Sequence, residues 1–156
     1  MNLKKILLSL LCLTFIICLS GCKEKKALTI SEFKDIMKKY NYVLDETASK
    51  ELLNKEENKI LKDAIIEKNE ESKTTITFYT LNNIKDTKEY FNNTSIAKEL
   101  QKGSISNNNT NNYQSLSLIN GDNYSYIARF DNTIIEISSK TSNEEAIQEL
   151  LKEINY

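Results

Sequence analysis

Apolar residues recur at spacings of three and four in two segments of the chain, and less regularly in a third, which is the spacing of one face of an α-helix. The clearest segment follows Thr29, which forms a capping-box pattern with Glu32 and so marks a helix start. The pattern predicts helices over about residues 30–40, 86–100 and 142–154. The apolar stripe of the first helix consists of Ile30, Phe33, Ile36, Met37 and Tyr40.

The ends of the second and third helices are indicated by polar and glycine residues. The second is expected to start at Asp86, which forms a capping-box pattern with Glu89, and to stop at Gly103, a suitable C′ residue. The third is expected to be capped by Thr141 or Ser142. The apolar sides of these two helices are expected to be Tyr90, Phe91, Ala97 and Leu100, and Ala146, Ile147, Leu150, Leu151 and Ile154.

Alternation of apolar and polar residues predicts β-strands between these helices. In Thr74–Leu81, for example, Ile76 and Phe78 alternate with threonines, as in a half-buried antiparallel strand. Asp131 and Asn132 separate two such segments and tolerate the positive φ of a type I′ turn, so a tight hairpin is expected there. Strands are expected over residues 42–47, 60–67, 74–81, 113–119, 124–130 and 133–139.

Two stretches lack a clear pattern. Residues 48–59 are polar apart from one leucine pair, and we expect a loop or a single helical turn. Residues 104–112 are rich in serine and asparagine, and we expect a mobile loop. The resulting order is α-β-β-β-α-β-β-β-α, and burial of each apolar face predicts one α+β domain over residues 29–156, an antiparallel sheet packed with helices.

The N-terminal segment has the pattern of a secretion signal. Lys4 and Lys5 precede an apolar run from Ile6 to Leu19, which is shorter than the roughly 20 residues a spanning helix needs. An uncleaved membrane anchor and an ordinary signal peptide are the alternatives. No A-x-A cleavage site follows the apolar run, which argues against the ordinary signal peptide.

The stretch Leu19-Ser20-Gly21-Cys22 resembles the lipobox of bacterial lipoproteins. The resemblance implies that signal peptidase II removes residues 1–21 and that Cys22 carries diacylglycerol. Residues 22–28 would then be a lipidated tether. Two or three acyl chains anchor a protein stably, so the protein is expected on the outer face of the cell membrane, with membrane lipid as its first partner.

Composition excludes several kinds of chemistry for the mature chain. Once Cys22 is lipidated, it holds no thiol, and the chain has no histidine, so zinc, copper and haem sites lack their usual ligands. Cysteine nucleophiles and Ser-His-Asp triads are excluded for the same reason. The formal net charge is −1 and lysines alternate with acids, which argues against a nucleic-acid partner. No cofactor is expected.

Arg129-Phe130-Asp131-Asn132-Thr133 is the most distinctive segment of the mature chain, and it contains the only arginine. It resembles the R-V-D-N-T segment of small uncharacterised lipoproteins of low-GC Gram-positive bacteria. That resemblance implies no catalytic residues. The Arg129 guanidinium could bind a carboxylate or phosphate as a planar fork, or it could pair with Asp131 or a neighbouring acid in a structural role. We favour the structural role.

Acidic and aromatic clusters are the remaining candidates. Glu67, Glu70 and Glu71 gather near a turn, as do Glu56 and Glu57, and carboxylate pairs can catalyse glycoside hydrolysis. A solvated surface accounts for these acids better. Tyrosines could form an aromatic ligand face, although sheet packing is the simpler interpretation. They are Tyr113, Tyr124 and Tyr126.

These observations favour a small non-enzymatic binding or interaction module, held at the membrane and able to bind an envelope protein. The alternatives are an enzyme that acts on cell-wall or extracellular polymer through carboxylates, and a structural or inhibitory partner of another envelope protein. An enzyme needs a concave site with converging acids, whereas a binding module needs an exposed patch.

Overall fold

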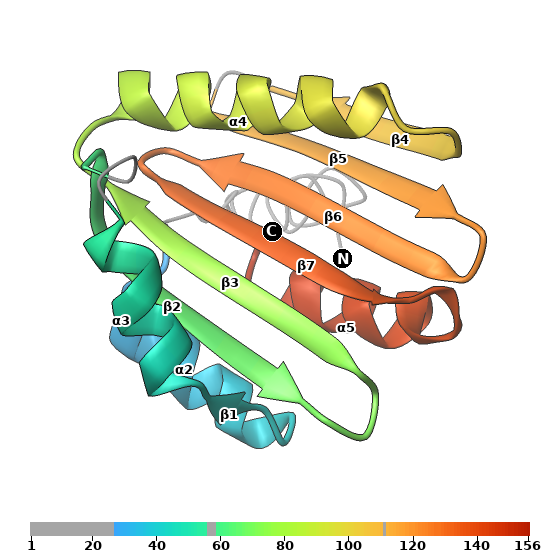
Figure 1. Cartoon of the computed structure of the whole chain (residues 1–156), viewed down its shortest axis with the longest axis horizontal. Coiled ribbons are helices and arrows are strands. Elements are labelled where there is room, and N and C mark those ends of the chain that lie inside the picture. The colour runs from blue at the N-terminus through green and yellow to red at the C-terminus, as the bar shows by residue number, and fades with distance from the viewer. Residues whose placement is uncertain (1–26, 56–58, 111) are drawn as a thin grey trace, which may run out of the picture.

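The structure, a computed structural model, describes residues 27–55, 59–110 and 112–156. The expected signal peptide, residues 1–21, and the expected lipidation site Cys22 lie outside the described residues. Figure 1 shows one twisted sheet with helices on both faces. All paired strands are antiparallel, in the order β1-β2-β3-β7-β6-β5-β4. The strands are β1 (Val43–Leu44), β2 (Leu61–Asn69), β3 (Thr74–Leu81), β4 (Ser104–Asn109), β5 (Tyr113–Asn120), β6 (Asn123–Phe130) and β7 (Thr133–Lys140).

The expected α+β class is confirmed, and the nine expected elements occur in their expected order. Helices α2 (Ile30–Lys39), α4 (Ile84–Glu99) and α5 (Glu144–Glu153) correspond to the three expected helices. The structure adds a helix, α3 (Glu46–Asn54), and the strand β4. Both additions come from segments without a clear apolar pattern.

One face of the sheet packs against α2 and α5. Phe33 of α2 stacks on Phe78 of β3 with ring centroids 4.6 Å apart, and both side chains are fully buried. Tyr156 lies edge-on to Phe78 and donates or accepts a hydrogen bond with Thr133, which ties the C-terminus to the sheet. Between the two helices, the Tyr40 hydroxyl bonds the Glu153 carboxylate. This face holds the larger of the two apolar clusters.

The other face packs against α3 and α4 around Tyr79, Leu81, Phe91, Leu116, Leu118, Ile127 and Ile134. The buried stripe of α4 consists of Thr87, Phe91 and Ser95, one residue per turn. The sequence placed Leu100 on the apolar side of this helix, but Leu100 is 82% exposed. Tyr90 and Phe91 pack on the sheet as expected, whereas Ala97 and Leu100 are exposed, so the prediction is correct for the first half of the helix and wrong for its end.

The boundaries of α4 also differ from the expectation. The helix begins after Asn83, whose side chain accepts a hydrogen bond from the backbone N–H of Asp86 at 2.9 Å. Asp86 is therefore not the N-cap residue. The C-cap residue is Leu100, three residues before Gly103. A Cβ on Gly103 would lie 2.3 Å from the Ile119 carbonyl oxygen, so this glycine permits close approach of the chain to β5.

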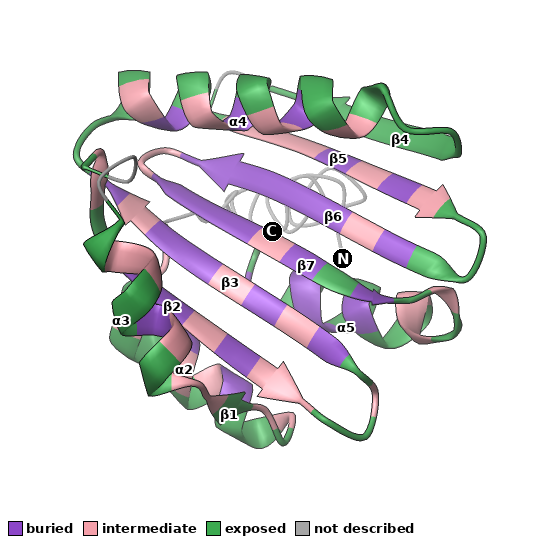
Figure 2. Cartoon of the chain, viewed as in Figure 1, coloured by how far each residue is buried: buried purple, intermediate pink, exposed green. Residues whose placement is uncertain are grey.

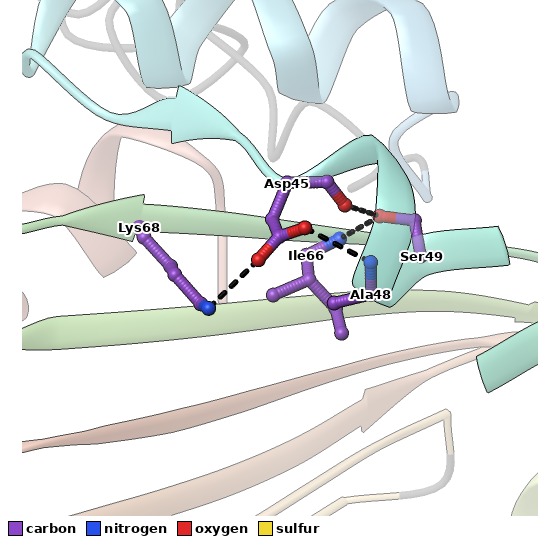
Figure 3. A network of polar contacts seen from close by, with 5 residues as sticks. All are labelled: Asp45, Ala48, Ser49, Ile66 and Lys68. Atoms are coloured by element: carbon purple, nitrogen blue, oxygen red, sulfur yellow. Dashed lines mark hydrogen bonds and ion pairs between the residues drawn. The ribbon is translucent and has the colours of Figure 1, made fainter. Parts of the chain in front are cut away.

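The expected strand over residues 42–47 is shorter than predicted, because the chain turns into α3 (Figure 3). Asp45 caps α3 by accepting a hydrogen bond from Ala48 N–H at 2.9 Å, and its carboxylate also bonds Lys68 of β2 at 2.7 Å. Ser49 donates to the Asp45 carbonyl and accepts from Ile66 N–H. These contacts join β1, α3 and β2. Lys68 and Ala48 hold the pKa of the Asp45 carboxyl below its ordinary value.

The expected loop at residues 104–112 is wrong for its first part, because Ser104–Asn109 form β4. All six residues of β4 are exposed, and Figure 2 shows the strand at one edge of the sheet. Its polar sequence has no alternation because neither of its faces is buried. Backbone pairing with β5, from Ser104 opposite Ile119 to Asn109 opposite Gln114, makes it a strand.

Three further details correct the sequence-based expectations. In the β6–β7 hairpin, Asp131 has φ of 50°, whereas Asn132 is not among the residues with positive φ, so the turn is not type I′. The last helix is preceded by a 3₁₀ turn, η2 (Thr141–Asn143), and no side-chain hydrogen bond caps it. Ala146, expected in its buried stripe, is exposed.

Candidate binding groove

A groove of about 380 Å³ lies between α4 and the strands β4 and β5. Its helical wall comes from residues spaced three or four apart on α4, which places them on one side of the helix. Its floor comes from the last residues of β4 and the first of β5. The lining residues are Phe91, Asn92, Ser95, Ile96 and Glu99 of α4, Asn107–Asn109 of β4, and Gln114–Leu116 of β5.

A second hollow of about 310 Å³ continues this groove toward the start of α4. The two share Asn92, Asn109 and Gln114. The second hollow adds Lys88, Thr110 and Arg129. We call the combined surface the α4–β4 groove. Its amide side chains can both donate and accept hydrogen bonds, and its one end carries two basic residues.

Ser95 provides the clearest sign that the α4–β4 groove is built to meet a polar group. The residue is 8% exposed, and its hydroxyl has no hydrogen-bond partner among the described residues. A buried hydroxyl without a partner costs about 1–3 kcal/mol. Because Ser95 lines the groove, a ligand atom there can accept or donate the missing hydrogen bond.

Arg129 forms the basic end of the groove from the sheet side. It is 3% exposed, and its Nε–H donates to the side-chain oxygen of Gln114 while Nη1 donates to the carbonyl of Asn112 at 3.4 Å. Burial lowers the pKa of the Arg129 guanidinium, and the charge of Asp131 acts in the opposite direction. These contacts hold the guanidinium at this end of the groove.

The other end of the groove is flanked by exposed apolar side chains. Ile96 is 57% exposed and Ile105 is 39% exposed, and both lie near the junction of α4 and β4 together with Leu100. These are three of the five large apolar side chains that the described part of the chain exposes. Exposed apolar residues that gather beside a groove are typical of an interaction surface.

The structure separates the acids that the sequence had grouped. Glu67 is 3% exposed on β2, and burial raises its pKa while the charges of Lys34 and Lys38 on α2 oppose that change. Glu70 and Glu71 lie exposed in the β2–β3 turn, and Glu56 and Glu57 lie outside the described residues. Glu67, Glu70 and Glu71 do not line the groove, and its one carboxylate among the described residues is Glu99.

Two acids on α4 do share a hollow. Asp86 and Glu89 line a space of about 330 Å³ with Ile60, Tyr90, Asn93 and Thr94. Asp86 takes part in the N-terminal cap of α4, because its carboxylate accepts a hydrogen bond from the Asn83 side chain at 2.8 Å. This structural contact accounts for the position of the Asp86 carboxylate, and no catalytic role is needed to explain it.

The tyrosines expected to pack on the sheet do so. Tyr124 is fully buried, and burial raises its pKa to about 12. Burial also raises the pKa of Tyr126, whose hydroxyl lies 2.8 Å from that of Tyr113. They face α5, on the side of the sheet opposite the groove. They therefore do not form an aromatic ligand face.

The described residues show neither a metal-ligand cluster nor a membrane-spanning helix. Within residues 27–55, 59–110 and 112–156, no group of three or more metal-ligating side chains gathers. In that part of the chain, no helix has the length and apolar character to cross a membrane.

The sequence did not predict the groove because part of its floor is β4, which was expected to be a loop. It did single out Arg129, which the structure places in the groove. Searches of known protein families, curated proteins and solved structures find no match to this chain.

Proposed function

We propose that this chain is a lipid-anchored lipoprotein on the outer face of the cell membrane, and that it acts as a binding module through the α4–β4 groove. The anchor rests on the Leu19-Ser20-Gly21-Cys22 stretch, with Cys22 as the lipidated residue. The binding role rests on one observation above all: the buried Ser95 hydroxyl in the lining of the groove has no hydrogen-bond partner among the described residues.

A binding role fits the groove better than carboxylate catalysis. General acid–base hydrolysis uses two carboxylates that flank the bond to be cut. Among the residues that the structure describes, the groove offers Glu99 as its one acid, together with amides, hydroxyls and two basic residues. Such a lining recognises polar groups by hydrogen bonds and charge.

The anchor is tested by replacing Cys22 with Ala in cells supplied with radiolabelled palmitate. The variant should lose lipid labelling and keep its signal peptide. Labelling at the wild-type level would show that the anchor assignment is wrong.

The groove is tested by site-specific photo-cross-linking in cells that express the full chain. A photoreactive side chain replaces Asn92, which lines both parts of the groove, or Ala97, an exposed residue of the same helix that does not line it. Adducts should form from position 92 and not from position 97. Equal adduct formation at both positions, or none at position 92, would contradict groove binding.

A further inference from the structure

The free edge of β4 adjoins the groove, and its backbone can bind another strand. In the described residues β4 ends the sheet order, and β5 is its one partner. Thr110 N–H donates to the Tyr113 carbonyl at 2.7 Å, just beyond Asn109 opposite Gln114. Antiparallel pairs alternate between bonded and non-bonded residues. The backbone groups of Ile105, Asn107 and Asn109 therefore point away from β5.

This edge lacks the features that usually protect an edge strand. Proteins discourage strand addition with charged residues, proline, bulges or very short strands. The opposite edge of the sheet, β1, is only two residues long. By contrast, Ser104–Asn109 contain no charge and no proline, and the pairing with β5 is continuous. The strand is long enough to hold a partner in register.

The side chains around this edge indicate what the partner carries. Ile105, Asn107 and Asn109 share the face of the sheet on which α4 lies, because they are opposite Leu118, Leu116 and Gln114. At the Asn109 end, the nearby charges are those of Lys88 and Arg129. Toward the chain start of β4, the exposed apolar residues are Ile105 itself, Ile96 in the groove lining and Leu100 at the end of α4.

We propose that the groove binds an extended polypeptide segment, which adds to β4 as an eighth, antiparallel strand. In this mode backbone hydrogen bonds hold the strand and alternate side chains give specificity. The residue opposite Asn109 is acidic, because Asn109 shares its hollow with the basic residues Lys88 and Arg129. The residue opposite Ile105, four positions later, is apolar. The inference rests on the proposed binding role of the groove.

The probe is a capped synthetic peptide with aspartate, threonine and isoleucine at successive alternate positions, separated by threonines. It is titrated against the full lipidated chain in detergent micelles. On binding, hydrogen exchange should slow at the amides of Ile105, Asn107 and Asn109. Replacing the peptide aspartate with lysine should weaken binding about tenfold.

Backbone pairing is tested separately from side-chain contact. Asn107→Pro removes an outward N–H, which an edge strand tolerates, and it should weaken binding at least about tenfold. Asn107→Ala keeps this N–H and loses the side-chain amide, so it should weaken binding less than Asn107→Pro does, and the difference measures the backbone hydrogen bond. The peptide supplies an independent test: N-methylation of its edge-facing amides should abolish binding, and N-methylation of the intervening amides should not.

Several results would overturn strand addition. They are unchanged exchange at the three amides in the bound state, equal binding of both N-methylated peptides, and absence of peptide binding. The oligomeric state of the wild-type chain is measured alongside. If the wild-type chain self-associates, Asn107→Pro does not, and the peptide does not bind, then the occupant of the edge is a second copy of the chain and the peptide proposal is wrong. If the Asn92 cross-link forms without peptide binding, groove binding stands and strand addition is wrong. If the cross-link is also absent, both proposals fail.

Discussion

Arg129 of β6 and Gln114 of β5 are direct partners across the β5–β6 ladder, and the Arg129 Nε–H donates to the Gln114 side-chain oxygen. This bond aims the only arginine of the chain at the basic end of the α4–β4 groove. Arg129 therefore has a structural contact within the sheet and also lines the proposed binding site. The sequence had presented these roles as alternatives.

Gln114→Glu separates the two roles. A glutamate there keeps an acceptor for Arg129 and adds a charge that cancels the guanidinium charge. We expect the fold to persist and the affinity for the acidic peptide to fall about tenfold. Calorimetric titration at two salt concentrations measures the change. Gln101→Glu adds the same charge at an exposed position outside the groove lining and should leave the affinity near that of wild type.

Ser95→Ala should make the protein more stable and a weaker binder. Alanine removes a buried hydroxyl that has no partner among the described residues, so the free energy of unfolding should rise by about 1 kcal/mol. Urea denaturation and peptide titration measure the two effects. The matched variant is Thr87→Val on the same buried stripe. The Thr87 hydroxyl donates to the Asn83 carbonyl at 2.9 Å, so its loss should lower stability by about 1 kcal/mol. A Ser95→Ala variant that is less stable than wild type would show that the hydroxyl has an internal partner.

The sequence predicted the apolar framework of the fold better than its groove. Ile76 and Phe78 alternate with polar residues, and Phe33 and Met37 share one helical face, so burial of these side chains determines both the strand and the helix. Strand β4 buries no side chain and forms through backbone pairing with β5. Backbone pairing has no apolar signature, so β4 was expected to be a loop.

The orientation of α4 escaped prediction for a related reason. Its buried stripe contains two hydroxyl residues, Thr87 and Ser95, and a single large apolar residue, Phe91. Ile96 of α4 and the C-cap residue Leu100 remain exposed, so apolar residues lie on both the packed and the exposed sides of the helix. The groove is lined by residues from both sides, including Ser95 and Ile96. The amino-acid composition of the helix alone does not predict this lining.

Because of Glu67, we expect the free energy of unfolding to fall as the pH rises. Burial raises the pKa of its carboxyl, so the folded state retains the proton at a pH at which the unfolded chain has lost it. The protonated form therefore contributes stability below the unfolded pKa, and this contribution is lost as the pH rises through the folded pKa. Glu67→Gln should remove this loss and be more stable than wild type near neutral pH. Melting temperatures from about pH 4 to pH 8 measure the effect. The exposed Glu70→Gln should follow the wild-type curve, and a Glu67→Gln curve parallel to it would refute the assignment.

Asp131 is the residue of the β6–β7 hairpin that should resist β-branched substitution. Its φ of 50° lies in the left-handed region, which glycine adopts freely. Asp131→Gly should therefore be tolerated, whereas Asp131→Val should lower the free energy of unfolding by about 1–3 kcal/mol. Asn132→Val tests the corrected turn geometry and should cost less, because Asn132 is not held at positive φ. Chemical denaturation ranks the three variants, and a larger loss for Asn132→Val than for Asp131→Val would contradict this assignment.

Gly103→Ala should detach β4 from the sheet and abolish binding without melting the core. The added Cβ would lie 2.3 Å from the Ile119 carbonyl oxygen and 2.6 Å from Leu118 Cδ1, so the chain entering β4 must move away from β5. Hydrogen exchange should speed up at Ser106 and Asn108, whose amides face β5, while amides of β6 and β7 keep their protection.

Gly121→Ala is the matched control for that experiment. A Cβ on Gly121 meets nothing within 4 Å, but the residue has φ of 57°, so alanine should cost about 1 kcal/mol through backbone strain alone. It should leave β4 exchange and peptide binding unchanged. If Gly103→Ala retains both β4 protection and binding, then the close approach of Gly103 to β5 does not position the edge strand. If it loses β4 protection but still binds the peptide, β4 is not the surface to which the strand adds.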